Sequence, residues 1–259
     1  MNRAVAVFSV LLPFSMALVA CDEKKEAPPS QDKPATPAKP EATTPAAPPA
    51  PVTGVRLKVG KAKGTFLIDA PAEKIKGISE DGKGEISIDP MDLGKSRGEV
   101  SIKLTTLATN TFGDKKQDDS QTEHARNWME VGPESSADKK AKYEYAKLTI
   151  TGVETATPKL ADVKEEGGAR TFKAKVMGDL WIHGITSKKT LMVTVTVKGP
   201  VDAPTEAMIK TDEPFAVSMK EHEIMPRDKV GSFLSGALEK IGKKIDDKVQ
   251  VSIEATAAK

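Results

Sequence analysis

Three histidines are the side chains of this chain best suited to binding a metal or transferring a proton: His124, His183 and His222. A zinc site needs three or four protein ligands, and the short His and Cys spacings typical of such sites are absent. The G-x-S-x-G motif of serine hydrolases is also absent, as is a Gly-rich phosphate loop after a strand. We therefore predict that the protein is not an enzyme. A metal enzyme built on the three histidines stays as the second alternative.

Each histidine also has a structural interpretation that the sequence favours. His222 lies between two glutamates, which fits a solvated strand end better than a metal pair. His183 precedes Gly184 in an expected turn, where a backbone hydrogen bond would fix the turn. His124 and Arg126 either contact a ligand head group or hold the adjacent loop, and the loop role is slightly preferred. Together, His124, Arg126 and His183 are the candidates for the polar mouth of a cavity.

The single cysteine, Cys21, ends an apolar stretch over residues 4–20 that follows Arg3. This pattern predicts a signal peptide over residues 1–20, because the stretch is short for a spanning helix and is interrupted by Pro13. Residues 18–21 (LVAC) resemble a bacterial lipobox. The resemblance implies acylation of Cys21 with several chains, palmitate among them, and lasting membrane attachment. An uncleaved signal anchor is the alternative.

Residues 21–53 are expected to form a disordered tether after the lipidated cysteine. Residues 22–53 hold nine of the 18 prolines and many alanines, and cannot bury enough apolar surface to offset the entropy of ordering. The expected location is therefore the periplasmic side of a bacterial envelope, on the inner or the outer membrane. The net charge of +2, from 39 basic and 37 acidic residues, provides no general attraction to nucleic acid, and no nucleic-acid partner is expected.

Residues 54–259 show the period-two alternation of antiparallel strands with one wet face. In one such run, Leu191, Val193, Val195 and Val197 share a face opposite Thr194 and Thr196. Eight or nine strands with little helix predict an all-β sandwich or closed barrel. The strands are expected at these places: 64–69, 84–89, 100–104, 147–152, 172–182, 191–197, 207–211, 215–219 and 249–253.

Two segments have helical rather than strand patterns. Residues 120–123 (SQTE) have capping-box spacing, which predicts one or two helical turns over 124–129. Residues 232–245 place apolar side chains at helical spacing, which predicts a short amphipathic helix. The Lys- and Glu-rich stretches 132–141 and 159–170 are expected to be surface loops.

Three motifs, in order, resemble those of the YceI family. They are DDSQTEHARNWMEV at 118–131, GDLWIHGIT at 178–186, and the closing pair formed by 227–231 (RDKVG) and 246–249 (DDKV). Asp247 stands where the family has a glycine, Trp128–Met129 where it often has two phenylalanines, and the first strand lacks the usual tryptophan. The resemblance covers roughly residues 55–256. It implies a lipocalin-like, up-and-down antiparallel β-barrel of about eight strands with one or two short helices.

The same resemblance implies a long apolar cavity that takes a polyisoprenoid chain, such as an isoprenoid quinone or a prenyl lipid. No other cofactor is expected, and a homodimer is left open. An eight-stranded ring either holds one small ligand or is filled by side chains, and with 4% aromatics few large rings are present to fill it. We therefore predict a non-catalytic lipid-binding protein, and the first alternative is an envelope interaction protein with a filled core. The residues expected to line the cavity are Phe66, Ile68, Ile86, Ile102, Leu104, Trp128, Met129, Phe172, Val176, Leu180, Val193, Val195, Phe215 and Val217.

Overall fold

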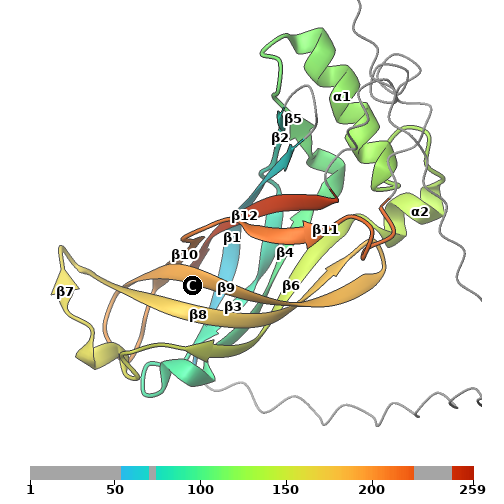
Figure 1. The fold of residues 1–259 in the computed structure, drawn as a ribbon. Helices are drawn as coiled ribbons and strands as arrows, with labels where there is room; N and C mark the ends of the chain where they lie inside the picture. Colours follow the sequence, from blue (N-terminus) through green and yellow to red (C-terminus); the bar gives the residue numbers. More distant parts are fainter. Residues whose placement is uncertain (1–53, 70–73, 225–246) are drawn as a thin grey trace, which may run out of the picture. The chain divides into compact units, whose positions relative to one another are not determined.

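The computed structural model describes residues 54–69, 74–224 and 247–259, and these form a sheet-based fold with two short α-helices (Figure 1). The strands are β1 (Val55–Asp69), β2 (Lys74–Ser79), β3 (Gly82–Ile88), β4 (Arg97–Lys103), β5 (Ala108–Thr109), β6 (Tyr145–Glu154), β7 (Glu165–Glu166), β8 (Ala169–Ile182), β9 (Ile185–Lys198), β10 (Glu206–Thr211), β11 (Phe215–Ser218) and β12 (Lys248–Ala258). The α-helices are α1 (Lys115–Trp128) and α2 (Ala137–Lys142), and three short 3-10 helices are η1 (Leu93–Lys95), η2 (Leu104–Thr106) and η3 (Leu160–Asp162).

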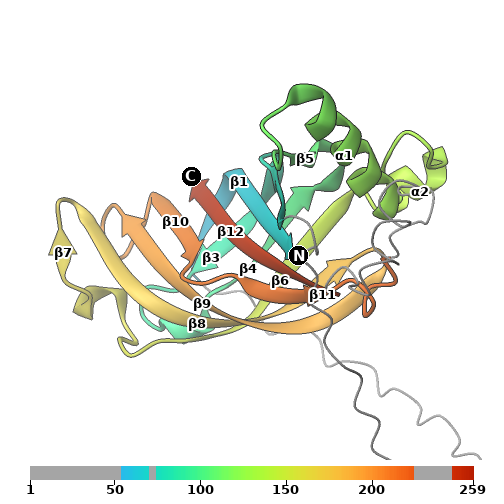
Figure 2. The ribbon, with the colours of Figure 1, turned by 45° about the horizontal axis from the view of Figure 1, so that its top comes forward.

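Eight of the strands close into a ring of antiparallel neighbours. The order around the ring is β1, β3, β4, β6, β8, β9, β10 and β12, and β12 pairs with β1 to complete it. The long strands curve around a common interior, as Figure 2 shows. The predicted all-β, lipocalin-like class is confirmed, although the ring is not a regular barrel.

The irregularity of the ring comes from β1, which changes its partner along its length. Residues 55–59 of β1 pair with β3, whereas residues 64–69 pair with β2, and the register with β12 shifts between Val59 and Lys61. A bulge of this kind bends a strand and increases its twist. β2 and β5 therefore extend the sheet beyond the ring at the end where the helices lie (Figure 1).

The apolar residues that alternate along the strands point into the ring and form its interior. Leu191, Val193, Val195 and Val197 on β9 are at most 7% exposed, so this face points inward. On β8 the same phase buries Ala174, Val176, Leu180 and Ile182. Because successive side chains of a strand point to opposite faces, the polar residues between them face solvent.

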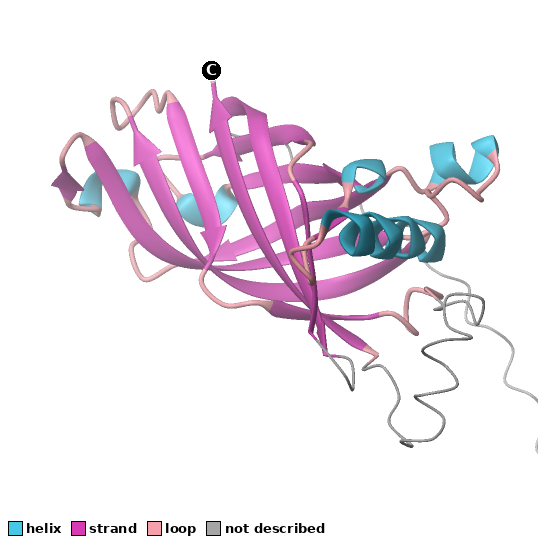
Figure 3. Ribbon diagram, turned by 90° about the horizontal axis from the view of Figure 1, so that it is seen from above, coloured by secondary structure: helices cyan, strands magenta, loops and turns pink. Residues whose placement is uncertain are grey.

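The two ends of the ring differ in what covers them. Figure 3 shows α1 and α2 together at one end of the strands, and this end is called the helix end below. The opposite end carries the short connections between β3 and β4 and between β6 and β7, and is called the loop end. None of the helices among the described residues has both the length and the hydropathy needed to cross a bilayer.

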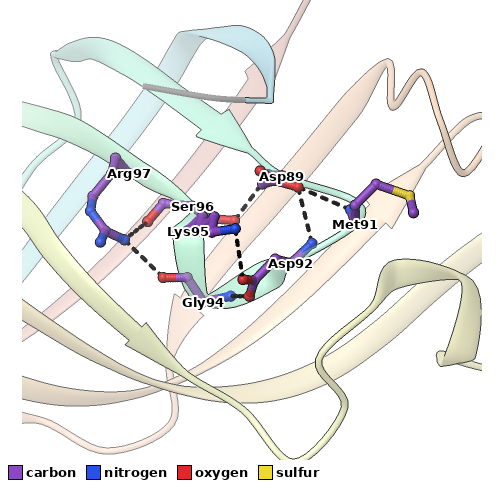
Figure 4. Close-up of polar contacts among 7 residues, drawn as sticks. All are labelled: Asp89, Met91, Asp92, Gly94, Lys95, Ser96 and Arg97. Atoms are coloured by element: carbon purple, nitrogen blue, oxygen red, sulfur yellow. Dashed lines mark hydrogen bonds and ion pairs between the residues drawn. The ribbon is translucent and has the colours of Figure 1, made fainter. Parts of the chain in front are cut away.

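The β3–β4 connection at the loop end is held by its own polar groups (Figure 4). The Asp89 carboxylate accepts hydrogen bonds from the backbone N–H groups of Met91 and Asp92, both at 3.0 Å. The Arg97 guanidinium donates to the carbonyl of Gly94 at 2.9 Å. Such side-chain bonds satisfy backbone groups that a tight turn would otherwise leave unpaired.

Two leucines complete the closure of the loop end. Leu93 from η1 and Leu160 from η3 are each 1% exposed, and the backbone N–H of Leu160 donates to the carbonyl of Pro90 at 2.9 Å. The prediction that 159–170 is only a surface loop is therefore wrong for Leu160. An isolated leucine among polar residues has no periodicity to reveal that its side chain is buried. The same stretch also forms the short strand β7, which pairs with β8.

Helix α1 begins earlier than the sequence predicted. Asp114 is its N-cap, and the Asp114 carboxylate accepts from the backbone N–H of Gln117 at 3.0 Å, whereas Ser120 lies inside the helix. Asp is as good an N-cap as Ser, so the capping-box spacing at 120–123 did not mark the boundary. The stretch 132–141, expected as a loop, includes most of α2, which Ser136 caps. The predicted helix over 232–245 and the motif at 227–231 lie outside the described residues.

Candidate functional site: an apolar cavity at the helix end

A cavity of about 150 Å³ lies inside the ring at its helix end. Strand residues from β1, β4, β6, β8, β11 and β12 form most of its wall. Ala125 and Trp128 of α1 and Met129, which follows α1, complete it. Thr65 and Ser79 contribute hydroxyl groups to this wall. The other lining side chains are apolar apart from the indole N–H of Trp128. The Ser79 hydroxyl is already bonded, to the carbonyl of Lys103 at 2.7 Å. The lining is therefore suited to an apolar occupant.

Nine of the fourteen residues predicted to line a ligand cavity lie in this wall. They are Phe66, Ile68, Ile102, Leu104, Trp128, Met129, Leu180, Phe215 and Val217. Segments far apart in the sequence thus surround one cavity, because β12 pairs with β1 and α1 packs against β5.

The other predicted lining residues lie elsewhere in the interior. Ile86, Phe172, Val176 and Val195 line a second, smaller cavity of about 40 Å³ at the loop end. Val193 is 2% exposed in the core and lines neither cavity. The sequence predicted one long cavity, whereas the described interior has a separate cavity towards each end.

Several lining residues of the helix-end cavity were not predicted. The clearest are Val249, Val251 and Ile253 on β12 and Leu148 on β6. The alternation of the β12 residues placed them on one strand face, which was the available signal. Alternation does not say which stretch of a strand faces empty space, since that depends on the side chains across the ring.

The β8–β9 turn sits beside this cavity and carries His183. His183 and Gly184 have φ angles of +52° and +86°, as a two-residue type I′ hairpin requires, and the preceding residue, Ile182, lines the cavity. The Nδ1 atom of His183 lies 3.0 Å from the carbonyl of His222, so this nitrogen donates. The expected backbone hydrogen bond is present, but it ties the turn to the segment after β11 rather than to the turn itself.

His183 also faces a carboxylate that is held by a lysine. The Nε2 atom of His183 lies 3.3 Å from Oε2 of Glu130, and the His183 ring packs on Tyr143 with centroids 4.3 Å apart. The hydrogen bond from Lys139 lowers the pKa of Glu130 below its ordinary value, against the opposing effect of partial burial, and the positive charge of Lys139 adds to the lowering. This cluster links the chain after α1 to the β8–β9 turn, and so fixes the edge of the cavity wall next to Met129.

His222 is fully buried, at 0% exposed, which makes the predicted solvated strand end wrong. Its Nδ1 atom lies 3.1 Å from the carbonyl of Ile182, and its Nε2 atom lies 3.0 Å from the Ser187 hydroxyl. Both ring nitrogens of His222 thus have a hydrogen-bond partner in the buried interior. His222 therefore joins the segment after β11 to β8 and β9. The prediction of exposure rested on the two neighbouring glutamates. The contacts that bury His222 come from residues distant in the sequence, so no local pattern reveals them.

His124 and Arg126 lie on α1, and neither lines the cavity. The Nε group of Arg126 donates to the carbonyl of Leu107 at 2.7 Å, which holds the chain before α1 against the helix. This contact is the loop role that the sequence slightly favoured. Among the described residues, no three His, Cys, Asp or Glu side chains gather in a way that could hold a metal ion.

Asp247, in the predicted closing motif, makes specific contacts in the structure. The Asp247 carboxylate accepts from the Ser218 hydroxyl and from the backbone N–H of Lys220, both at 2.6 Å. The Ser218 hydrogen bond, then that of Lys220, lowers the pKa of Asp247. The carboxylate thus anchors the start of β12 to the end of β11, next to lining residues Val217 and Met219.

A sequence model described as the YceI-like domain matches residues 56–257. The chain belongs to the YceI-like family. This YceI-like chain has the same fold as a polyisoprenoid binding domain from Saccharophagus degradans implicated in plant cell wall breakdown. The two share 13% identity with a TM-score of 0.51, over 80% of this chain and 99% of that one.

Two further solved structures are more distant matches. The Burkholderia cenocepacia protein BcnA is 16% identical, with a TM-score of 0.44 over 76% of this chain and 96% of that one. A Campylobacter jejuni YCEI protein is 18% identical, with a TM-score of 0.38 over 71% of this chain and 84% of that one. A search of curated proteins finds no match.

Proposed function

We propose that this YceI-like protein binds an isoprenoid or another lipid-like amphiphile in the helix-end cavity, and that it does so without catalysis. The observation that carries the proposal is the cavity itself, about 150 Å³ in volume and walled by aliphatic and aromatic side chains. An apolar cavity of this size can take a small apolar molecule or the end of an apolar chain. A relative of the same fold is described as polyisoprenoid binding, which supports the ligand class.

The energy of the proposed binding comes from apolar burial. Each Å² of apolar surface removed from water contributes about 25 cal/mol, offset in part by the cost of ordering the ligand. The indole Nε1 of Trp128 is buried without a hydrogen-bond partner among the described residues, so it offers a donor near the apolar wall. Specificity in such sites comes from a few polar groups of this kind.

We also propose that Cys21 is acylated and holds the protein on the periplasmic side of an envelope membrane. The proposal rests on the lipobox-like residues 18–21 and on the apolar stretch before them, which lie outside the described residues. Growth with labelled palmitate tests it. The full chain should take up label, and Cys21→Ser should not; equal labelling of both chains would remove the anchor.

Native mass spectrometry of the purified full chain, followed by organic extraction, tests the ligand. The expected result is a discrete adduct of lipid mass at about one per chain. A bare protein mass that persists after incubation with quinones and prenyl lipids would remove the lipid-binding proposal. A His-dependent catalytic role is tested in parallel, because His124→Ala and His183→Ala should leave the adduct unchanged in chemical structure.

A further inference from the structure

The boundary between the two cavities falls between neighbouring inward-facing residues of the same strands. On β6, Leu148 lines the helix-end cavity and Ile150, the next inward residue, lines the loop-end cavity. On β8, Leu180 lines the first and Val176 the second. No described residue lines both cavities. The apolar interior is therefore interrupted at the level of Ile150 by side chains rather than by backbone.

The surroundings of Ile150 differ from those of Leu148. Leu148 pairs with Val100 on β4 and Leu180 on β8, so a continuous row of large side chains crosses the three strands. Ile150 instead pairs with a glycine on each side, Gly98 on β4 and Gly178 on β8. Ile150 is therefore the one side chain of its row on these three described strands.

The glycines leave no room to spare beside this row. A Cβ at Gly178 would lie 3.0 Å from Cδ1 of Leu148 and 2.8 Å from the carbonyl oxygen of Thr149. Leu148 thus leans into the space that Gly178 leaves. The separation between the cavities on this side of the ring depends on Leu148 and Ile150, and Ile150 is the one that faces the smaller cavity.

We propose that Ile150 is the stop that limits how deeply the apolar chain of a bound lipid enters the ring. The proposal rests on lipid binding at the helix end and adds a limit on length. An apolar cavity of about 150 Å³ is large enough for a molecule about the size of benzene. The part of the lipid inside the cavity is therefore the end of its apolar chain, about one or two prenyl units, and Ile150 keeps further units out of the apolar space beyond.

A ladder of prenyl alcohols tests this limit on the full chain. Prenol, geraniol, farnesol and geranylgeraniol contain one to four prenyl units, and their affinities are measured by titration calorimetry. A newly buried prenyl unit should raise affinity by about tenfold or more. For the unaltered chain the affinity should rise up to geraniol and then change less than about twofold. A continuous rise through geranylgeraniol would overturn the proposal.

Ile150→Ala should move the plateau by at least one prenyl unit, because it removes the large side chain that separates the two cavities along β6. Ile88→Ala is the matched control, since Ile88 is also buried and also lines the loop-end cavity. Because Ile150 is still present in Ile88→Ala, the alcohol length at which the affinity stops rising should not change. If Ile88→Ala shifts the plateau as far as Ile150→Ala does, the prenyl chain of the ligand already passes Ile150 and the proposal fails.

Failure of the stop and failure of lipid binding give different results with these alcohols. Binding of the ladder with no dependence on residue 150 contradicts the stop alone, whereas the absence of binding by every alcohol contradicts lipid binding itself. Ile150→Val, which removes one methyl group, provides the test if Ile150→Ala does not fold. It should raise the affinity for farnesol relative to geraniol, and an unchanged ratio counts against the stop.

Discussion

The two ends of the ring are closed in different ways, and only one of them leaves a sizeable space. At the loop end, short connections satisfy their own backbone groups and insert Leu93 and Leu160, and about 40 Å³ remains. At the helix end, the wall is completed by α1, whose Trp128 and Met129 are only partly buried, and about 150 Å³ remains. Closure by compact turns favours stability, while closure by a helix face leaves room for an occupant.

The largest effect on stability is expected at the loop end. Leu93→Ala should lower the free energy of unfolding by about 3 kcal/mol, because it removes a fully buried side chain and leaves a cavity. Ligand affinity at the helix end should not change. Chemical denaturation measures the first quantity and calorimetry with geraniol the second.

Met91→Ala is the control for that prediction, because Met91 is in the same connection but 70% exposed. It should change the free energy of unfolding by less than about 0.5 kcal/mol. A loss of geraniol binding in Leu93→Ala would mean that the two ends of the ring are coupled rather than separate.

A smaller effect on stability, but a larger one on binding, is expected at the helix end. Met129→Ala should weaken geraniol binding by about tenfold, since Met129 lines the cavity and its removal takes away apolar contact. Met192→Ala is the control, as Met192 is 48% exposed on the outer face of β9. Equal affinities for the two variants would show that the ligand does not occupy this cavity.

The smallest effect is a pH dependence at the edge of the helix end. The folded pKa of Glu130 is held below its ordinary value by Lys139, so the stability it contributes is fully present above the unfolded pKa. This contribution is lost as the pH falls through the lower folded pKa. Melting temperatures of the unaltered chain and of Glu130→Gln should therefore differ at pH 7 and differ less at a pH below the folded pKa of Glu130.

A constant difference between these two melting temperatures over that pH range would contradict an ionised Glu130 as the cause. The loop end serves as the comparison, since substitutions at Leu93 change no charge and should shift the melting temperature equally at both pH values.

Much of the fold could be predicted because strand alternation is local. The runs on β8, β9, β10 and β12 were all present where expected, and the turn at His183–Gly184 follows from two residues that tolerate positive φ. β2, β5 and β7 were missed. β5 and β7 have only two residues each, and β2 mixes lysines and a glycine with its isoleucines, so none has a strong pattern.

The candidate site could be predicted only in part. Alternation correctly put Phe66, Leu180 and Val217 on the inner face, but it also placed Val193 there, which lines neither of the two cavities. Inward direction is a local property, whereas empty space depends on what the opposite wall contributes. His222 shows the same limit, since its burial is created by contacts with Ile182 and Ser187, about forty residues away in the chain.

The sequence by itself determined which faces of the strands are apolar, where the β8–β9 hairpin turns and which family the motifs resemble, and it predicts an exported, lipid-anchored chain. The tertiary structure decided that the described interior holds two separate cavities, that the helix-end cavity is the larger of the two, and that His222 is buried. The physical reason is that a period of two fixes side-chain direction along one strand. Which side chains of different strands face each other inside the ring is set by the strand register, by the bulge in β1 and by the pairing of β1 with β12.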